Sequence, residues 1–326
     1  MAEQYVYAVT RVHANEQGLL SRADLEALIS ADTVAAAFRL LADKGWGSPD
    51  LPANDPDALV AYETDRTWSL IAELMEDASP FDVFRIANDY QNLKAAIKLA
   101  YSATDEADTG RFFVGHGTIP VETIVKAANE HDFSSLPPEM AEAGKGAYEA
   151  LAHTGVGQSC DIAIDRAALV AIGKAGKETK SALLKRYAEL TVDGANIKMA
   201  VRCCAMGKSR EFIDSAIAPA GTLNTGKLCA AAADSMDAIY DVLKDSAYAG
   251  AIDELKAGLA AFERWMDDQM IEMIKPQRKN YFSIEPLAAF ILGRENEIKM
   301  VRLILSAKIN NLSSDALRER LRETYV

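Results

Sequence analysis

Apolar residues recur along most of the chain at intervals of three and four positions, which is the period of an α-helix. The alternation of every second residue that is typical of strands is nearly absent, and the best strand candidate, residues 112–114, is short and flanked by glycine. The pattern therefore predicts an all-α fold. We expect helices over residues 5–17, 21–30, 32–44, 57–75, 80–87, 89–101, 121–129, 139–152, 161–174, 177–190, 193–206, 225–232, 235–244, 251–274, 284–292, 295–306 and 313–322.

Several of these helices carry sequence signals at their ends. Ser21 and Asp24 have the spacing of a capping box, which marks the start of the helix that reaches residue 30. Gly45 is expected to end the helix over 32–44. Pro276 is expected to end the helix over 251–274, which would be among the longest in the chain.

A short motif recurs roughly every hundred residues and is the most informative feature of the sequence. Residues 89–94 read Asp-Tyr-Gln-Asn-Leu-Lys, residues 193–198 read Asp-Gly-Ala-Asn-Ile-Lys, and residues 294–299 read Arg-Glu-Asn-Glu-Ile-Lys, a degenerate third copy. This recurrence predicts three related helical units, over 1–110, 111–215 and 216–326, that arose by duplication. The signature residues are Asp89, Asn92, Lys94, Asp193, Asn196, Lys198, Lys299 and Arg302.

The helical period gives the signature a meaning. In a helix, Asp89 and Asn92 lie within one turn of each other beside the apolar Leu93, while Lys94 lies on the far side. One interpretation is a functional site that recurs in each unit. The other is a helix N-cap together with a buried polar tie between neighbouring helices. We favour the structural interpretation, because a catalytic site is rarely found three times in one chain.

Composition narrows the function classes. Hydrophobic residues make up 49% of the 326 residues, which is enough for a sizeable core. The 48 acidic and 35 basic residues give a net charge of −13, which argues against a general nucleic-acid binder. The four cysteines show no CxxC spacing, so we expect reduced thiols in a cytoplasmic protein. The sequence shows neither a signal peptide nor an apolar stretch long enough to span a membrane.

Motifs that carry catalysis are sparse. The P-loop, HExxH and GxSxG patterns do not occur, so no catalytic, cofactor or metal site is predicted. The strongest enzyme alternative is the run that contains Asp267, Asp268 and Glu272, which is similar to the magnesium-diphosphate motif of class I terpenoid cyclases. A second metal motif of the kind those enzymes carry is not apparent, and we favour a solvated acidic helix face as the explanation of the run.

The C-terminal part of the chain resembles a known family. Residues 281–290 read Tyr-Phe-Ser-Ile-Glu-Pro-Leu-Ala-Ala-Phe, residues 295–305 read Glu-Asn-Glu-Ile-Lys-Met-Val-Arg-Leu-Ile-Leu, and residues 318–326 read Arg-Glu-Arg-Leu-Arg-Glu-Thr-Tyr-Val. Together with the start of the chain and the motif at 89–94 and 193–198, these stretches resemble the C subunit of prokaryotic V-type and A-type ATPases, whose eukaryotic counterpart is the d subunit. The resemblance spans essentially the whole chain.

The resemblance implies a funnel-like, all-helical protein of three similar units that catalyses nothing itself and needs no cofactor. Family members sit as one copy on the cytoplasmic face of the membrane rotor ring and hold the foot of the central stalk. The implied function is therefore mechanical coupling between ATP hydrolysis or synthesis and proton or sodium transport, with membrane contact only through partners. The alternative is a helical-repeat scaffold that binds another protein. The residues that would contact the ring or the stalk are not identified by the sequence.

Overall fold

The computed structural model describes residues 2–102 and 110–326, and in these residues it contains helices and no strand. The predicted all-α class is confirmed. The chain divides into two compact units: unit 1 comprises Met1–Ala78 and Ala257–Val326, and unit 2 comprises Ser79–Lys256. Unit 1 therefore combines the two ends of the chain. The three sequence units over 1–110, 111–215 and 216–326 stay a prediction.

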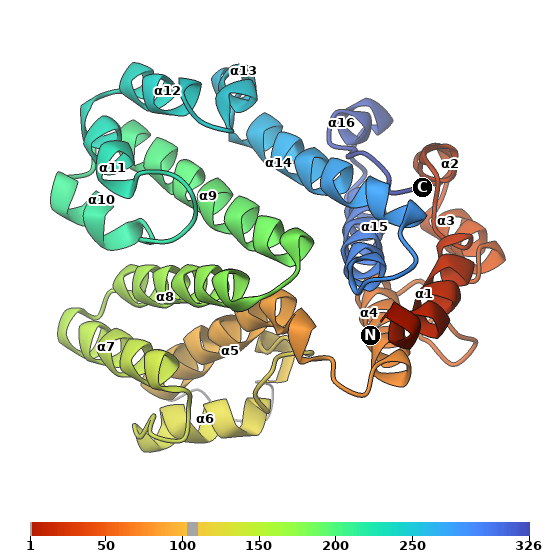
Figure 1. Cartoon of the computed structure of the whole chain (residues 1–326), viewed down its shortest axis with the longest axis horizontal. Helices are drawn as coiled ribbons and strands as arrows, with labels where there is room; N and C mark the ends of the chain where they lie inside the picture. The colour runs from red at the N-terminus through yellow and green to blue at the C-terminus, as the bar shows by residue number, and fades with distance from the viewer. Residues whose placement is uncertain (1, 103–109) are drawn as a thin grey trace. The chain divides into compact units, whose positions relative to one another are not determined.

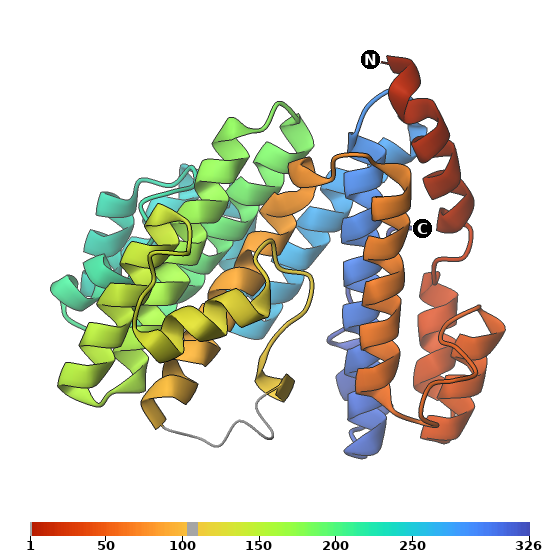
Figure 2. The same ribbon diagram turned by 90° about the horizontal axis from the view of Figure 1, so that it is seen from below.

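Unit 1 is organised around α4 and α15, which pack side by side (Figure 2). α4 begins where Asp55 caps the helix and Pro56 occupies its first turn. The short helix α2 begins with the predicted capping box, in which Ser21 and Asp24 bond to each other's backbone N–H groups. The elements of unit 1 are α1 (Ala2–Glu16), α2 (Arg22–Ser30), α3 (Val34–Asp43), α4 (Pro56–Leu74), α14 (Leu259–Ile274), η5 (Lys275–Lys279), α15 (Glu285–Ile309) and α16 (Ser314–Arg318).

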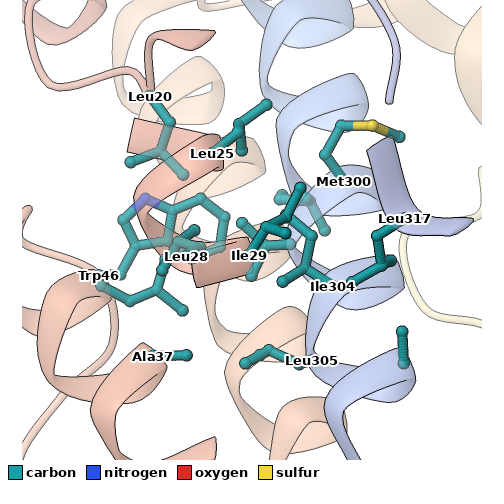
Figure 3. Close-up of a cluster of buried hydrophobic side chains, with 14 of the residues drawn as sticks. Leu20, Leu25, Leu28, Ile29, Ala37, Trp46, Met300, Ile304, Leu305 and Leu317 are labelled. Atoms are coloured by element: carbon teal, nitrogen blue, oxygen red, sulfur yellow. The ribbon is translucent and has the colours of Figure 1, made fainter. Parts of the chain in front are cut away.

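The core of unit 1 joins residues from both ends of the sequence. Side chains of α2 and α3 meet side chains of α15 and α16 in one buried cluster (Figure 3). Burial of these side chains stabilises the unit by about 1.5–3 kcal/mol for each large aliphatic residue. The cluster includes Leu20, Leu25, Leu28, Ile29, Ala37, Trp46, Met300, Ile304, Leu305 and Leu317.

Unit 2 is built on three long helices, α5, α8 and α9, which follow one another in space in that order (Figure 1). α7 covers α5 and α8, and α11 packs on α9. The elements of unit 2 are η1 (Ser79–Phe81), α5 (Asp82–Ser102), η3 (Gly110–Phe112), α6 (Val121–Glu130), α7 (Pro138–Thr154), α8 (Gly157–Glu178), α9 (Ala182–Ala205), α10 (Arg210–Ala216), α11 (Thr225–Asp234), α12 (Met236–Lys244) and η4 (Ala249–Ala251). α13 (Ile252–Ala257) lies at the boundary with unit 1.

Some predicted helix boundaries are wrong, and most of the errors share a cause. The helices predicted over 80–87 and 89–101 form one helix, α5; those over 177–190 and 193–206 form α9, and those over 284–292 and 295–306 form α15. The signature residues were taken for helix starts, but they lie inside long helices because their polar groups have partners elsewhere. The helix predicted over 251–274 is instead divided at Gly258, whose φ of +129° is accessible mainly to glycine. Within the described residues, none of the helices has the length and hydropathy that crossing a bilayer requires.

Candidate functional site

The first copy of the signature fastens a loop onto α5. Asp89 is 2% exposed, and its carboxylate accepts hydrogen bonds from the backbone N–H of Thr118 at 2.9 Å and of Ile119 at 3.1 Å. The hydroxyl of Thr118 donates to the same carboxylate at 2.6 Å. One turn further on, the Asn92 amide accepts from the N–H of Val114 at 2.7 Å and donates to its carbonyl at 2.9 Å. The two side chains therefore clamp the loop that precedes α6.

The second copy repeats this arrangement on α9. Asp193 accepts from the N–H of Thr222 at 3.0 Å, from its hydroxyl at 2.5 Å and from the N–H of Leu223 at 3.2 Å. Asn196 exchanges two hydrogen bonds with the backbone of Ala218, at 2.9 and 3.0 Å. In both copies the threonine lies 29 residues after the aspartate, and the residue that pairs with the asparagine lies 22 residues after it. The loop that is held precedes α11, as its counterpart precedes α6.

A glycine makes room for the carboxylate in each of these two copies. A Cβ atom on Gly117 would lie 2.2 Å from an oxygen of Asp89, and one on Gly221 would lie 2.2 Å from an oxygen of Asp193. Gly221 also has a φ of +86°, which other residues rarely adopt. The signature therefore depends on a glycine that directly precedes each threonine.

The second copy has a further partner that the first copy lacks. The hydroxyl of Tyr248, a fully buried residue, donates to Asp193 at 2.9 Å. Burial, together with the neighbouring carboxylate, raises the pKa of Tyr248. The phenol therefore stays protonated and remains a donor.

The third copy, on α15, uses different chemistry. Arg294 stands at the position of the aspartates, and its guanidinium binds the carboxylates of Glu63 and Glu297, which are both buried. Glu297 accepts from the backbone N–H of Leu20, directly before the residue that caps α2. The third tie thus holds a loop from the start of the chain. Burial raises the pKa of Glu297, and the Arg294 charge opposes this shift.

An aromatic ring also adjoins the third copy. The guanidinium carbon of Arg294 lies 4.8 Å from the ring centre of Trp46, within the range of a cation–π contact. A pocket of about 440 Å³ beside this network is lined by residues that include Trp46, Glu63 and Arg294.

The bases of the signature lie on helix surfaces and form ion pairs. Lys94 bonds Asp165 of α8 at 2.6 Å, and Lys299 bonds Asp267 of α14 at 2.7 Å. Arg302 bonds the exposed Asp57 of α4 at 2.9 Å. Lys198 lies half-buried on α9. Exposed pairs of this kind contribute roughly 0–1 kcal/mol each, so the buried acids and amides carry most of the energy of the signature.

The acidic run on α14 is engaged by the C-terminal segment. Asp267 binds Arg322 as well as Lys299, and Asp268 accepts from the N–H of Glu323 at 2.8 Å. Glu272 pairs with Lys275. Among the described residues, no group of three or more His, Cys, Asp or Glu side chains is placed to hold a metal ion. These carboxylates therefore fix the end of the chain against α14.

Sequence reasoning identified the aspartates and asparagines but not their partners. Thr118, Thr222 and Tyr248 lie 29 to 55 residues along the chain from the aspartate that each one contacts. Gly117 and Gly221, which directly precede the two threonines, were missed for the same reason. One signal was available: Gly-Thr at 117–118 and at 221–222 recurs with the same offset from each aspartate.

Comparison with known proteins gives a consistent result. The profile of the ATP synthase (C/AC39) subunit family matches residues 8–320. The C subunit of the V-type sodium ATPase of Enterococcus hirae is 20% identical over 320 residues, which cover 96% of this chain and 97% of the relative. The C subunit of the A-type ATP synthase of Methanocaldococcus jannaschii is 24% identical over 345 residues, covering 97% and 86%. That of Haloferax volcanii is 25% identical over 248 residues, covering 72% and 70%.

Proposed function

Because the chain belongs to the ATP synthase (C/AC39) subunit family, we propose that it is the rotor subunit that couples the central stalk to the membrane rotor ring. It is a non-catalytic subunit of a V-type or A-type ATPase. In the proposed role, one copy sits peripherally on the cytoplasmic face of the membrane and touches the membrane only through its partners. ATP hydrolysis or synthesis is thereby linked to proton or sodium transport.

The observation that carries this proposal is the family match over residues 8–320. The structure adds a physical reason why the chain suits the role. A coupling subunit must transmit torque without yielding, and close-packed helices deform little under load. The buried ties at Asp89, Asp193 and Glu297 additionally fix the loops that precede α6, α11 and α2, so these loops cannot slide along their helices.

Native mass spectrometry tests the proposal directly. The purified chain would be mixed with the central-stalk subunits and the detergent-solubilised rotor ring of the same organism, at low salt. We expect a complex that contains one copy of this chain together with stalk and ring. The chain alone with the ring, and alone with the stalk, are the controls that assign each contact.

A scaffold that serves another partner is the competing function, and it predicts a different result. If the folded chain, verified by its helical circular dichroism, binds neither ring nor stalk, the coupling role is refuted. If more than one copy binds each ring, the single-copy role is refuted.

A further inference from the structure

The first and second copies of the signature differ in what covers the aspartate. Asp193 accepts the hydroxyl of Tyr248 in addition to the threonine and the loop amide. Asp89 accepts the same threonine and loop donors, but it has no hydroxyl from an aromatic side chain among the described residues. The first aspartate therefore accepts from three donors, where the second accepts from four.

The aromatic side chains that contact the signature residues come from the same place in the chain, just after a short helix. Tyr248 comes twelve residues after Met236, the first residue of α12. Trp46 likewise comes twelve residues after Val34, the first residue of α3. Tyr248 covers the aspartate of the second copy, and Trp46 covers the arginine of the third. At the same interval after the start of α7 the chain has Ala150, a small residue inside a longer helix, whereas Tyr248 and Trp46 lie beyond the ends of theirs.

A pocket lies beside Asp89. It has a volume of about 790 Å³ and lies among α5, α7 and α8. Its wall is mainly apolar and includes Ile86, Tyr90, Ile119, Met140 and Val170. The polar and charged residues of the lining are Asp89, Thr118, Glu139, Glu142, Arg166, Lys174, Glu178 and Ser215. The mainly apolar wall beside the Asp89 carboxylate suits a ring that carries a hydrogen-bond donor.

We propose that this pocket binds the tyrosine side chain of another polypeptide, whose hydroxyl donates to Asp89 as that of Tyr248 donates to Asp193. The ring occupies the apolar wall. The rim suits the backbone and polar neighbours of such a residue, because it carries the ion pair of Glu139 and Lys174 and the nearby Glu142 and Glu178. The pocket is also larger than a single ring, so it admits a segment of chain and not only a free phenol.

Small molecules that mimic a tyrosine side chain test whether the pocket binds such a ring, and the whole chain of 326 residues is used. The chain would be labelled with ¹³C in its methionine methyl groups and titrated with N-acetyltyrosinamide. Met140 lines the pocket and is the reporter, while Met300, buried in unit 1, is the reference. We expect a saturable shift of the Met140 methyl signal in the millimolar range and an unchanged Met300 signal.

The hydroxyl is tested with N-acetylphenylalaninamide, which lacks it. A hydrogen bond to an ionised carboxylate predicts binding of this probe that is weaker by about tenfold or more. Equal affinity of the two probes would refute the role of Asp89. Binding of p-cresol without binding of N-acetyltyrosinamide would refute the tyrosine of a polypeptide as the occupant.

Three substitutions distinguish an effect on the pocket from an effect on the fold. Val170→Trp fills the pocket without touching the bonds of Asp89, and it should abolish the shift, whereas Ala230→Trp on the exposed face of α11 should leave it unchanged. Asp89→Asn should remove the preference for tyrosine in protein that retains its circular dichroism. A Met140 shift that survives Val170→Trp would contradict the proposal, and so would the absence of any saturable shift in the parent protein.

Discussion

Asp193 offers the sharpest test of the buried ties, because one fully buried carboxylate satisfies four donors. These are the N–H and hydroxyl of Thr222, the N–H of Leu223 and the hydroxyl of Tyr248. Asp193→Ala removes the acceptor that two loop amides, the Thr222 hydroxyl and the buried phenol of Tyr248 share. Each buried donor left unsatisfied costs roughly 1–3 kcal/mol, so we expect a loss of about 4 kcal/mol or more.

A graded series checks this reasoning. Asp193→Asn keeps one oxygen for the two loop amides, so it should cost less than Asp193→Ala. Tyr248→Phe removes one hydrogen bond to a charged group and should cost about 1.5–3 kcal/mol. Asp165→Ala is the matched control on the surface, since it breaks only the exposed pair with Lys94 and should cost about 1 kcal/mol or less.

The readout should be local as well as global, since a chain of two units need not unfold in one step. Urea unfolding followed by circular dichroism gives the global loss. Hydrogen exchange measured by mass spectrometry on the peptide over 217–224 gives the local loss, which we expect as roughly thousandfold faster exchange. The untouched loop over 113–120 is the internal reference. A loss below about 1 kcal/mol for Asp193→Ala, with unchanged exchange in 217–224, would refute the view that this tie holds the loop.

Three further outcomes follow from the structure. Arg294→Met removes the guanidinium that two buried acids share and leaves Glu63 only the longer pair with Arg66 at 3.6 Å, so it should cost about 3–5 kcal/mol in urea unfolding. Arg302→Met on the same helix should cost about 1 kcal/mol or less. Burial raises the pKa of Glu295 from 4.5 to about 7, so its contribution to stability should be full below pH 4.5, fall as the pH rises to 7 and stay reduced above it. Glu295→Gln should lessen this fall, to which the raised pKa of Glu297 also contributes, and an unchanged pH profile would contradict the prediction. Burial raises the pKa of Cys229 to about 11, so the half-buried Cys204 should react first with a thiol reagent at about pH 8. Faster reaction at Cys229 would show that α11 opens readily.

The sequence predicts local features well and distant ones poorly. The helical period and the capping box at Ser21 depend on residues within a few positions of each other, and the structure confirms both. The false helix starts near Asp89 and Asp193 came from treating buried polar residues as caps. Their polarity is instead satisfied by loops 22 to 30 residues further along, which no local pattern reveals.

The third tie marks the limit of sequence reasoning more clearly. Glu297 meets the N–H of Leu20 across 277 residues, and Arg294 meets Glu63 across 231. The sequence showed only that the third copy departs from the other two. In the structure, the third copy replaces the aspartate and asparagine with Arg294 and Glu297, so the chemistry of the tie changes. It still holds a loop directly before a short helix, α2.

The position that each tie holds is the same although the residues differ. Ile119, Leu223 and Leu20 each donate their backbone N–H to a signature carboxylate, and each directly precedes the N-cap of α6, α11 or α2. Glu297 lies one turn further along its helix than the aspartates do along theirs, and its extra methylene lets it reach the equivalent amide. The common constraint is therefore the placement of one backbone amide and not the identity of a side chain. Because the third amide comes from the start of the chain and the carboxylate from its end, unit 1 needs both ends in place before its tie is complete.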